Sequence, residues 1–209
     1  MGKLIVTEFT TLDGVAQAPG EPEEDTSGDF PHGGWQAPLM DGAGGDKIFQ
    51  RAKTMDALLL GRRTYDIFAG YWPTADANSP FTGLLNGVPK YVASRTLTEP
   101  LAWQNSNLLA GSIAAAVESL KARHDEVHVI GSLDFAQTLL RLRLVDQIEL
   151  WLYPVLLGTG KRVFADGTVP TSLRLIDSEI YANGCLHLTY DTAGEPTYGT
   201  MEAHVPDDV

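Results

Sequence analysis

The sequence predicts an α/β protein with a mainly parallel central sheet, helices on both faces and an antiparallel C-terminal hairpin. Short apolar or β-branched segments alternate along the chain with segments of helical periodicity, which is typical of a parallel sheet covered on both sides. Two later strand-like segments follow one another across a short Asn-Gly turn, which indicates an antiparallel hairpin. The 209 residues, 44% of them hydrophobic, are enough for one sizeable core and few for two.

The first half of the chain contains three predicted strands, two predicted helices and a long loop. KLIVTEF at residues 3–9 alternates and is rich in β-branched residues, so we expect a strand there. Residues 13–45 are rich in glycine, proline and acidic residues and have no apolar period, and so long an irregular loop is usually functional or mobile. The other predicted elements of this half are a helix DKIFQRAKT (46–54), a buried strand ALLLG (57–61), a helix at 64–69 and a strand KYVAS (90–94).

In the second half, two serines mark the starts of predicted helices. Ser112 is expected to cap the helix at 112–123, and Ser132 the helix at 132–143, whose apolar residues share one face. The predicted strands of this half are VHVIG (127–131), QIELWLYPVLLG (147–158), SLRLIDSEIY (172–181) and CLHLTYD (185–191). One domain is therefore expected over residues 1–191, and residues 192–209 are expected to form a tail or an extra strand.

The composition argues against several classes of function. The formal net charge of −12 disfavours a nucleic-acid partner, because a phosphate backbone requires a basic surface. No segment approaches the roughly 20 apolar residues that cross a bilayer, and the first residues lack a signal-peptide pattern, so we expect a cytoplasmic protein without a membrane partner. Cys185 is the only cysteine and the histidines show no ligand spacing, so neither a disulfide nor a metal site is predicted.

The carboxyl ends of three predicted strands carry residues suited to binding phosphate, and parallel α/β sheets bind ligands at this edge. Gly61 and Gly131 each end a strand just before a helix, where backbone N–H groups attract anions and glycine permits close approach. Arginines and hydroxyl groups can add charge-assisted contacts. They follow two of the strands, as Arg62, Arg63 and Thr64 and as Ser94, Arg95 and Thr96.

These strand ends predict a ligand with more than one phosphate group. A purely structural interpretation is also open, in which glycine and serine cap the helices and an arginine pairs with Asp66. The chain contains neither a Walker loop nor a G-x-G-x-x-G fingerprint, so the two familiar nucleotide-binding folds are not supported.

Taken together, five motifs make the chain resemble the dihydrofolate reductase-like proteins, specifically the reductase half of the bifunctional riboflavin-biosynthesis deaminase–reductase. They occur in the family's order and span nearly the whole chain, and APGEPEED and HGGW resemble stand-alone members. The motifs are TTLDGV (10–15), ALLLGRRTY (57–65), YVASRTL (91–97), VHVIGS (127–132) and LVDQIELWLYPVLLGTGKRVF (144–164).

The resemblance implies NADPH as cofactor and hydride transfer as chemistry. By position, Gly61 to Thr64 would cradle phosphate, with Arg62 or Arg63 on the 2′-phosphate. Ala16 would face the nicotinamide, and the family usually has two glycines where this chain has Gly131-Ser132. The other implied cofactor contacts are Ser94, Arg95 and Thr96 at the adenosine 2′-phosphate end and Gly131, Ser132, Leu133 and Asp134 over the pyrophosphate.

Reduction of a C=N or C=O bond also requires a proton donor. Asp46 lies near the position of the acid in true dihydrofolate reductases, although it could instead be a helix N-cap. Asp13, at the end of the first strand, is the other candidate and could instead stabilise the turn with Gly14. Trp35 in the long loop is expected to line the substrate pocket, or alternatively to anchor its loop.

The expected function is an NADPH-dependent reductase of a small heterocyclic or ribosylamino substrate, similar to 5-amino-6-(5-phosphoribosylamino)uracil reductase. The chain lacks the H-x-E and P-C-x-x-C motifs of the deaminase half, and EPEED at 21–25 suits a phosphorylated substrate poorly. The alternatives are a pterin or small-carbonyl reductase, a catalytically silent nucleotide-binding protein, or an interaction protein. The family implies a homodimer; Trp151 and Tyr153 are candidates for its contact or for the sheet core.

Overall fold

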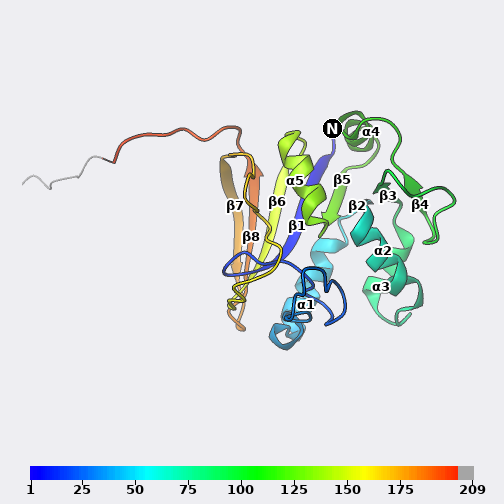
Figure 1. Cartoon of the computed structure of the whole chain (residues 1–209), viewed down its shortest axis with the longest axis horizontal. Helices are drawn as coiled ribbons and strands as arrows, with labels where there is room; N and C mark the ends of the chain where they lie inside the picture. Colours follow the sequence, from blue (N-terminus) through cyan, green and yellow to red (C-terminus); the bar gives the residue numbers. More distant parts are fainter. Residues whose placement is uncertain (202–209) are drawn as a thin grey trace, which may run out of the picture.

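The computed structural model describes residues 1–201, which form one eight-stranded sheet with helices on both faces (Figure 1). The strands are β1 (Lys3–Thr11), β2 (Ala57–Gly61), β3 (Lys90–Ala93), β4 (Ser106–Leu108), β5 (Glu126–Ile130), β6 (Gln147–Tyr153), β7 (Leu173–Ile180) and β8 (Leu186–Thr192). The α-helices are α1 (Gly42–Ala52), α2 (Arg62–Tyr71), α3 (Pro80–Gly87), α4 (Ile113–Arg123) and α5 (Leu133–Arg141), and two short 3₁₀ helices are η1 (Ala37–Leu39) and η2 (Trp72–Thr74).

The sheet has the order β4-β3-β2-β5-β1-β6-β8-β7. The six strands from β4 to β6 are parallel, and β8 and β7 are added antiparallel at one edge, which confirms the predicted fold class. Because parallel strands end at the same edge, the segments that follow β1, β2 and β5 meet there.

The central strands are buried on both faces because their alternate side chains pack into different cores. All five residues of β2 are buried. Leu59 packs with residues of α4 and α5 in one cluster, whereas Leu58 and Leu60 pack with Tyr65 of α2 in another. This double burial explains why β2 is a continuous apolar run rather than an alternating one.

Most of the predicted elements are confirmed, and two boundaries differ for identifiable reasons. Helix α1 begins at Gly42 rather than at residue 46, because Asp41 is its N-cap and accepts a hydrogen bond from the Gly44 N–H at 2.6 Å. Strand β6 ends at Tyr153, immediately before Pro154, which has no N–H to continue the ladder. Ser112 caps α4 as predicted, through the Ala115 N–H.

Ser132 lies at the N-cap of α5 as predicted, but its side chain does not cap this helix. The residue occupies the N-cap position, but in the left-handed conformation with φ of 63° and without a side-chain hydrogen bond to its own helix. Its hydroxyl instead accepts the Gly61 N–H at 2.9 Å. The serine therefore connects the end of β2 to the start of α5.

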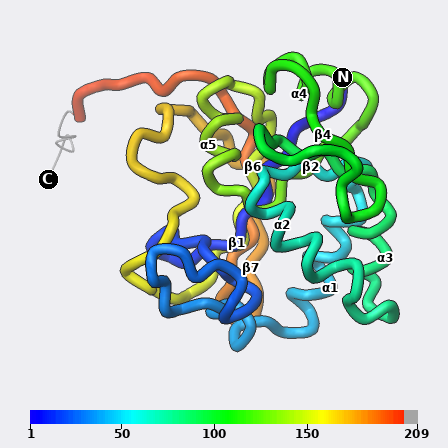
Figure 2. The backbone as a smooth tube through the Cα atoms, turned by 45° about the vertical axis from the view of Figure 1, so that its right-hand side comes forward, coloured from blue at the N-terminus to red at the C-terminus, as the bar shows by residue number. Residues whose placement is uncertain are grey.

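The long loop after β1 folds back against the segment that follows β6 (Figure 2). Val15 forms an isolated antiparallel bridge with Arg162, and the Ala16 N–H donates to the Lys161 carbonyl at 2.9 Å. Trp151 and Tyr153 of β6 are buried beneath this loop, so they belong to the core and do not form an exposed contact surface.

Strand β8 includes Thr192, and residues 193–201 contain no further strand. The end of the predicted tail, 202–209, lies outside the described residues. Within residues 1–201, no helix is long and apolar enough to cross a membrane.

Candidate functional site

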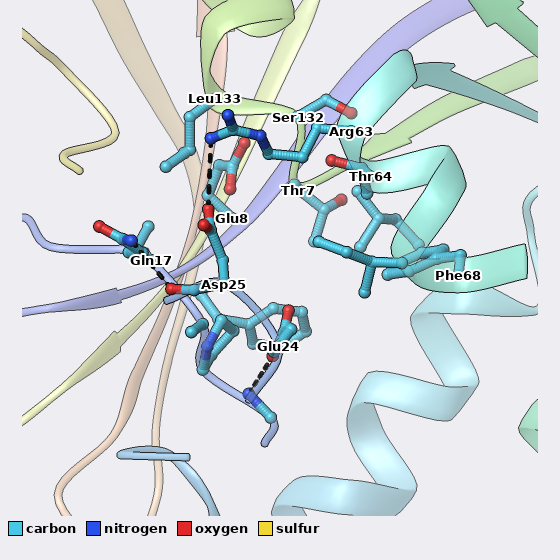
Figure 3. A pocket seen from close by; sticks show the side chains of 18 of the residues that line it. Thr7, Glu8, Gln17, Glu24, Asp25, Arg63, Thr64, Phe68, Ser132 and Leu133 are labelled. Carbon is cyan, nitrogen blue, oxygen red and sulfur yellow. Dashed lines mark hydrogen bonds and ion pairs between the residues drawn. The ribbon is translucent and has the colours of Figure 1, made fainter. Parts of the chain in front are cut away.

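A cleft of about 1140 Å³ lies at the carboxyl edge of the sheet (Figure 3). Its wall is formed by the second half of β1, the loop after β1, the starts of α2 and α5, and part of α1. The pairing of β1 with β5 ends at Thr7, whereas its pairing with β6 continues to Thr11. The cleft therefore opens where β1 and β5 separate.

The N-termini of α2 and α5 are held together at one end of the cleft. A hydrogen bond from the Gly61 N–H to the Ser132 hydroxyl connects the two turns. A Cβ atom at Gly61 would lie 3.0 Å from the Phe135 Cβ, so the close approach of α5 to β2 requires glycine there. The first N–H groups of a helix have no partner within it, and two such ends together favour an anion with two charged groups.

Gly131 has a φ of 65° and donates its N–H to the Thr7 carbonyl at 3.3 Å. With Ser132, two consecutive residues adopt the left-handed conformation that glycine accommodates best. Ser132 is less favourable than glycine in this backbone conformation, but its hydroxyl accepts the hydrogen bond from Gly61. The predicted phosphate-binding residues after β2 and β5, including Leu133 and Asp134, all line the cleft.

Arg62 connects the ends of β2 and β3. Its Nε donates to the Asp66 carboxylate at 2.6 Å, and its Nη1 donates to the Thr96 hydroxyl, also at 2.6 Å. The pairing with Asp66 that the structural interpretation expected is therefore present together with a contact between two of the predicted strand ends. Ser94, by contrast, closes its own turn by accepting the N–H groups of Thr96 and Leu97.

Arg95 is exposed and, within residues 1–201, forms no ion pair or hydrogen bond. It is not part of the cleft wall, and neither are Ser94 and Thr96. The Arg62–Thr96 bond places this turn just beyond the cleft, next to the start of α2.

Arg63 is held by residues 21–27 of the loop after β1, which we call the acidic loop, as Figure 3 shows. Its guanidinium lies 3.7 Å from the Asp25 carboxylate and donates to the Ser27 hydroxyl at 3.2 Å. The Asp25 carboxylate also accepts a hydrogen bond from Lys161. Burial raises the pKa of Asp25, but the hydrogen bonds from Lys161 and Ser27 outweigh it and leave that pKa lowered. The loop is therefore fixed across the cleft by an ionised carboxylate.

The wall on the α1 side is largely apolar. Its one arginine, Arg51, pairs with Glu149, a fully buried carboxylate that also accepts a hydrogen bond from the Thr7 hydroxyl. His128 of β5 also lines the cleft and is buried. The apolar residues of this wall are Phe9, Met40, Ile48, Phe68, Trp72, Phe81, Leu85 and Trp151.

Neither acid proposed from the sequence as proton donor lines the cleft. The Asp13 carboxylate accepts hydrogen bonds from the Thr11 hydroxyl and from the N–H groups of Leu157 and Gly158. Those bonds, the Thr11 bond foremost, lower its pKa despite partial desolvation. Asp13 thus stabilises a turn, as its structural interpretation expected. Asp46 is exposed on α1, and it is not the N-cap either, since Asp41 has that role.

Trp35 was expected in the substrate pocket, but it does not line the cleft. It is buried, stacks edge-on against Tyr153 and donates its indole N–H to the Gln17 carbonyl at 2.9 Å. The residue therefore anchors its loop, which was the alternative expectation. Ala16, by contrast, does line the cleft.

Glu8 is the acid that the sequence analysis missed. It is 2% exposed, lines the cleft from β1, and one of its carboxyl oxygens is buried without a hydrogen-bond partner. Burial raises its pKa to about 8. The signal was present in the sequence: Leu4, Val6 and Glu8 share one face of a β-branched strand, and an acid on an apolar strand face needs an explanation.

Comparisons with known proteins agree with this architecture. A model of the family described as RibD C-terminal domain matches residues 2–187. The uncharacterized protein YyaP of Bacillus subtilis (strain 168) is 28% identical over 147 residues, which cover 67% of this chain and 76% of YyaP.

Solved structures share the fold at low sequence identity. A candidate riboflavin biosynthesis protein of Shewanella sp. PV-4 has a TM-score of 0.68 and 23% identity, covering 91% of this chain and 99% of that one. A pyrimidine reductase-like protein of Corynebacterium diphtheriae has a TM-score of 0.65 and 14% identity, covering 93% of both chains. The deaminase/5-amino-6-(5-phosphoribosylamino)uracil reductase of Thermotoga maritima has a TM-score of 0.60 and 15% identity, covering 92% of this chain and 57% of that one.

Proposed function

The chain belongs to the RibD C-terminal domain family, which is a family of reductases, and from this premise we propose that it is an NADPH-dependent reductase. The reaction would transfer a hydride to a C=N or C=O bond of a small heterocyclic substrate. The observation that carries the proposal is the pair of helix N-termini, α2 and α5, joined through Gly61 and Ser132 at the end of the cleft. Two adjacent anion-binding turns suit the pyrophosphate of a dinucleotide.

The preference for NADPH over NADH is assigned to the turn after β3 and to Arg62. Arg95 is exposed and has no ion pair within residues 1–201, and Arg62 and Thr96 already contact each other beside it. The guanidinium groups of Arg62 and Arg95 would bind a phosphomonoester here. The hydroxyl groups of Ser94 and Thr96 would add hydrogen bonds to it. Arg63 is a weaker candidate, because Asp25 and Ser27 hold it on the acidic loop.

The α1-side wall favours a flat, aromatic substrate. Phe9, Ile48 and Phe68 offer apolar surface, and the charge of Arg51 is compensated by Glu149. A ribosylamino-pyrimidine of the kind that the Thermotoga maritima reductase is named for supplies such a ring. A pterin supplies one too and lacks the phosphate that the acidic loop would repel, so it is the second candidate.

A fluorescence titration with NADPH and NADH tests the cofactor assignment. Arg95→Ala and Arg62→Ala are each expected to weaken NADPH binding about ten- to a hundredfold, since a charge-assisted hydrogen bond contributes about 1.5–3 kcal/mol, and to leave NADH binding nearly unchanged. Arg141→Ala, on the far end of α5, is the matched control. If wild-type protein binds neither nucleotide, the proposal is wrong.

Turnover separates the reductase from a silent nucleotide-binding protein. Oxidation of NADPH would be followed in the presence of dihydrofolate, a small aldehyde and 5-amino-6-(5-phosphoribosylamino)uracil. Turnover of any of them excludes the silent protein. Their relative kcat/KM values rank the pterin, the small carbonyl compound and the ribosylamino-pyrimidine as substrates. Binding of NADPH without turnover of any would favour the silent protein.

A further inference from the structure

Glu8 is a buried acid that has no structural partner. Its side chain lies on the same face of β1 as Val6, and the sheet register places it opposite Leu150 of β6, which is also part of the apolar cluster under α4 and α5. Within residues 1–201, no hydrogen bond or ion pair reaches its carboxyl group, and one oxygen is buried without a partner. A fold that retains an unpaired buried acid at this cost usually uses it.

Glu8 lines the cleft at the place where β1 and β5 separate. The preceding residue, Thr7, is the last of β1 to pair with β5, and its carbonyl accepts the Gly131 N–H. Glu8 therefore lies next to the turn that is proposed to bind the pyrophosphate.

Within residues 1–201, none of the charged groups around Glu8 pairs with it. On its side of the cleft, Asp25 of the loop pairs with Arg63 of α2 and with Lys161 after β6. Glu24 accepts the N–H groups of Gly20 and Glu21. Asp134 of α5 also lines this side. The charged residues of the other face, which is that of Thr7, are Arg51, Glu149 and His128.

We propose that Glu8 is the proton donor of this reductase, an inference that rests on the function proposed above. The other acids of the cleft wall are exposed or only partly buried, and Asp25 and Asp66 form ion pairs with Lys161 and Arg62. Among the acids of residues 1–201 that line the cleft, only Glu8 is buried and has a carboxyl oxygen without a hydrogen-bond partner. Because burial raises its pKa to about 8, the group carries its proton at neutral pH.

The chemistry balances with this assignment. NADPH, when bound, supplies the hydride that forms a C–H bond at the carbon of the C=N or C=O group. As that bond forms, the π bond breaks and its electron pair moves to the nitrogen or oxygen. The heteroatom takes the proton from the Glu8 carboxyl, whose O–H bond breaks to leave a carboxylate. Glu8 then regains a proton from water, and the product and NADP⁺ leave.

The test compares wild type with Glu8→Gln and with Glu118→Gln, a control in an exposed acid of α4 that does not line the cleft. Glutamine keeps the size and neutrality of the protonated side chain but has no acidic proton. We expect Glu8→Gln to bind NADPH within about twofold of wild type and to lower kcat by roughly a hundredfold or more on the substrate that turns over fastest among those named above. Glu118→Gln should match wild type.

Two wild-type measurements keep the proposal testable even if Glu8→Gln fails to fold. The rate of reduction should fall as pH rises through about 8. Infrared difference spectra should show a protonated carboxyl band that disappears over the same range. A rate independent of pH across this range, or no such band at neutral pH, would contradict the assignment.

The outcomes also separate this inference from the proposed function. If wild type binds and oxidises NADPH but Glu8→Gln is equally fast, Glu8 is not the donor and the reductase assignment stands. If Glu8→Gln loses NADPH affinity while its saturated rate is unchanged, the residue contacts the cofactor and the inference is again wrong. If wild type does not bind NADPH at all, both fail together.

Discussion

A single carboxyl group on β1 links the stability of the fold to pH. The pKa of Glu8 is raised from 4.5 to about 8 by burial, so the folded state holds this proton more tightly than the unfolded chain does. The associated stability is fully present below about pH 4.5 and is lost as pH rises through about 8. Charging this side chain costs the fold roughly 3–5 kcal/mol.

We therefore expect the free energy of unfolding of wild type, relative to that of Glu8→Gln, to fall by roughly 3–5 kcal/mol between pH 5 and pH 9. Urea denaturation at several pH values measures this difference. The Glu8→Gln variant is the reference, because all other titrating groups are the same in the two proteins. Parallel curves for the two proteins would show that Glu8 is not buried as a neutral acid.

Ser132 gives a second prediction for single residues, because two local effects oppose each other there. The side chain accepts a hydrogen bond from Gly61, and the backbone has a φ of 63°. Ser132→Ala loses the bond and keeps the strained backbone, so it should destabilise by about 1–2 kcal/mol. Ser132→Gly loses the bond and relieves the strain, so it should be close to neutral. Equal losses of stability in the two variants, measured by urea denaturation, would contradict this explanation.

The candidate site was predictable in part, and the reason is local chemistry. Gly61, Gly131 and the residues after them could be predicted because strand ends and helix starts are recognisable in sequence. Trp35 and Asp46 were misplaced, because the direction of a side chain on a long loop or a glycine-rich helix depends on packing. The hydrogen-bond partner of the Ser132 hydroxyl and the exposure of Glu8 to the cleft could not be predicted, because both depend on segments distant in the sequence.

At the scale of elements, the strands were predictable because burial on both faces leaves a continuous apolar signature, as in β2. Helix α3 and strand β4 were missed, since they have eight and three residues and weak intrinsic signals. Tertiary contacts stabilise α3 instead. Lys90 of β3 is fully buried and donates to the carbonyls of Leu85, Asn86 and Val88 at the end of this helix.

This arrangement predicts that Lys90 stabilises α3 without contributing to the cleft. Lys90→Met keeps most of the side-chain volume but leaves several buried carbonyls without their donor, so it should destabilise by about 2–4 kcal/mol. Affinity for NADPH should be unchanged at temperatures where the variant is folded. Lys53→Met, an exposed lysine on a different segment, is the control and should stay within about 0.5 kcal/mol of wild type. A stable Lys90→Met protein in thermal denaturation would show that the carbonyl contacts contribute little.

At the scale of the whole molecule, the two edges of the sheet differ. The edge at β4 has three residues and is partly covered, whereas the edge at β7 has eight residues, most of them exposed. The side chains of Leu175, Ile176 and Ile180 are 50%, 46% and 80% exposed. A long edge strand with apolar side chains is a surface that proteins usually cover.

We therefore predict that the protein is a homodimer whose subunits meet at β7, with the apolar side chains making the contact. The register of β7 with β8 is shifted between Leu175 and Asp177, and this bulge exposes Ile176 and limits direct backbone pairing with a second copy. Two subunits of formal charge −12 repel one another, so the dimer should strengthen as salt rises. Sedimentation of Leu175→Glu and Ile180→Glu should show monomers, while Asn107→Glu on β4 should behave as wild type. If wild type is monomeric at high salt, the predicted dimer is wrong. If both β7 variants are dimers, the subunits meet at another surface.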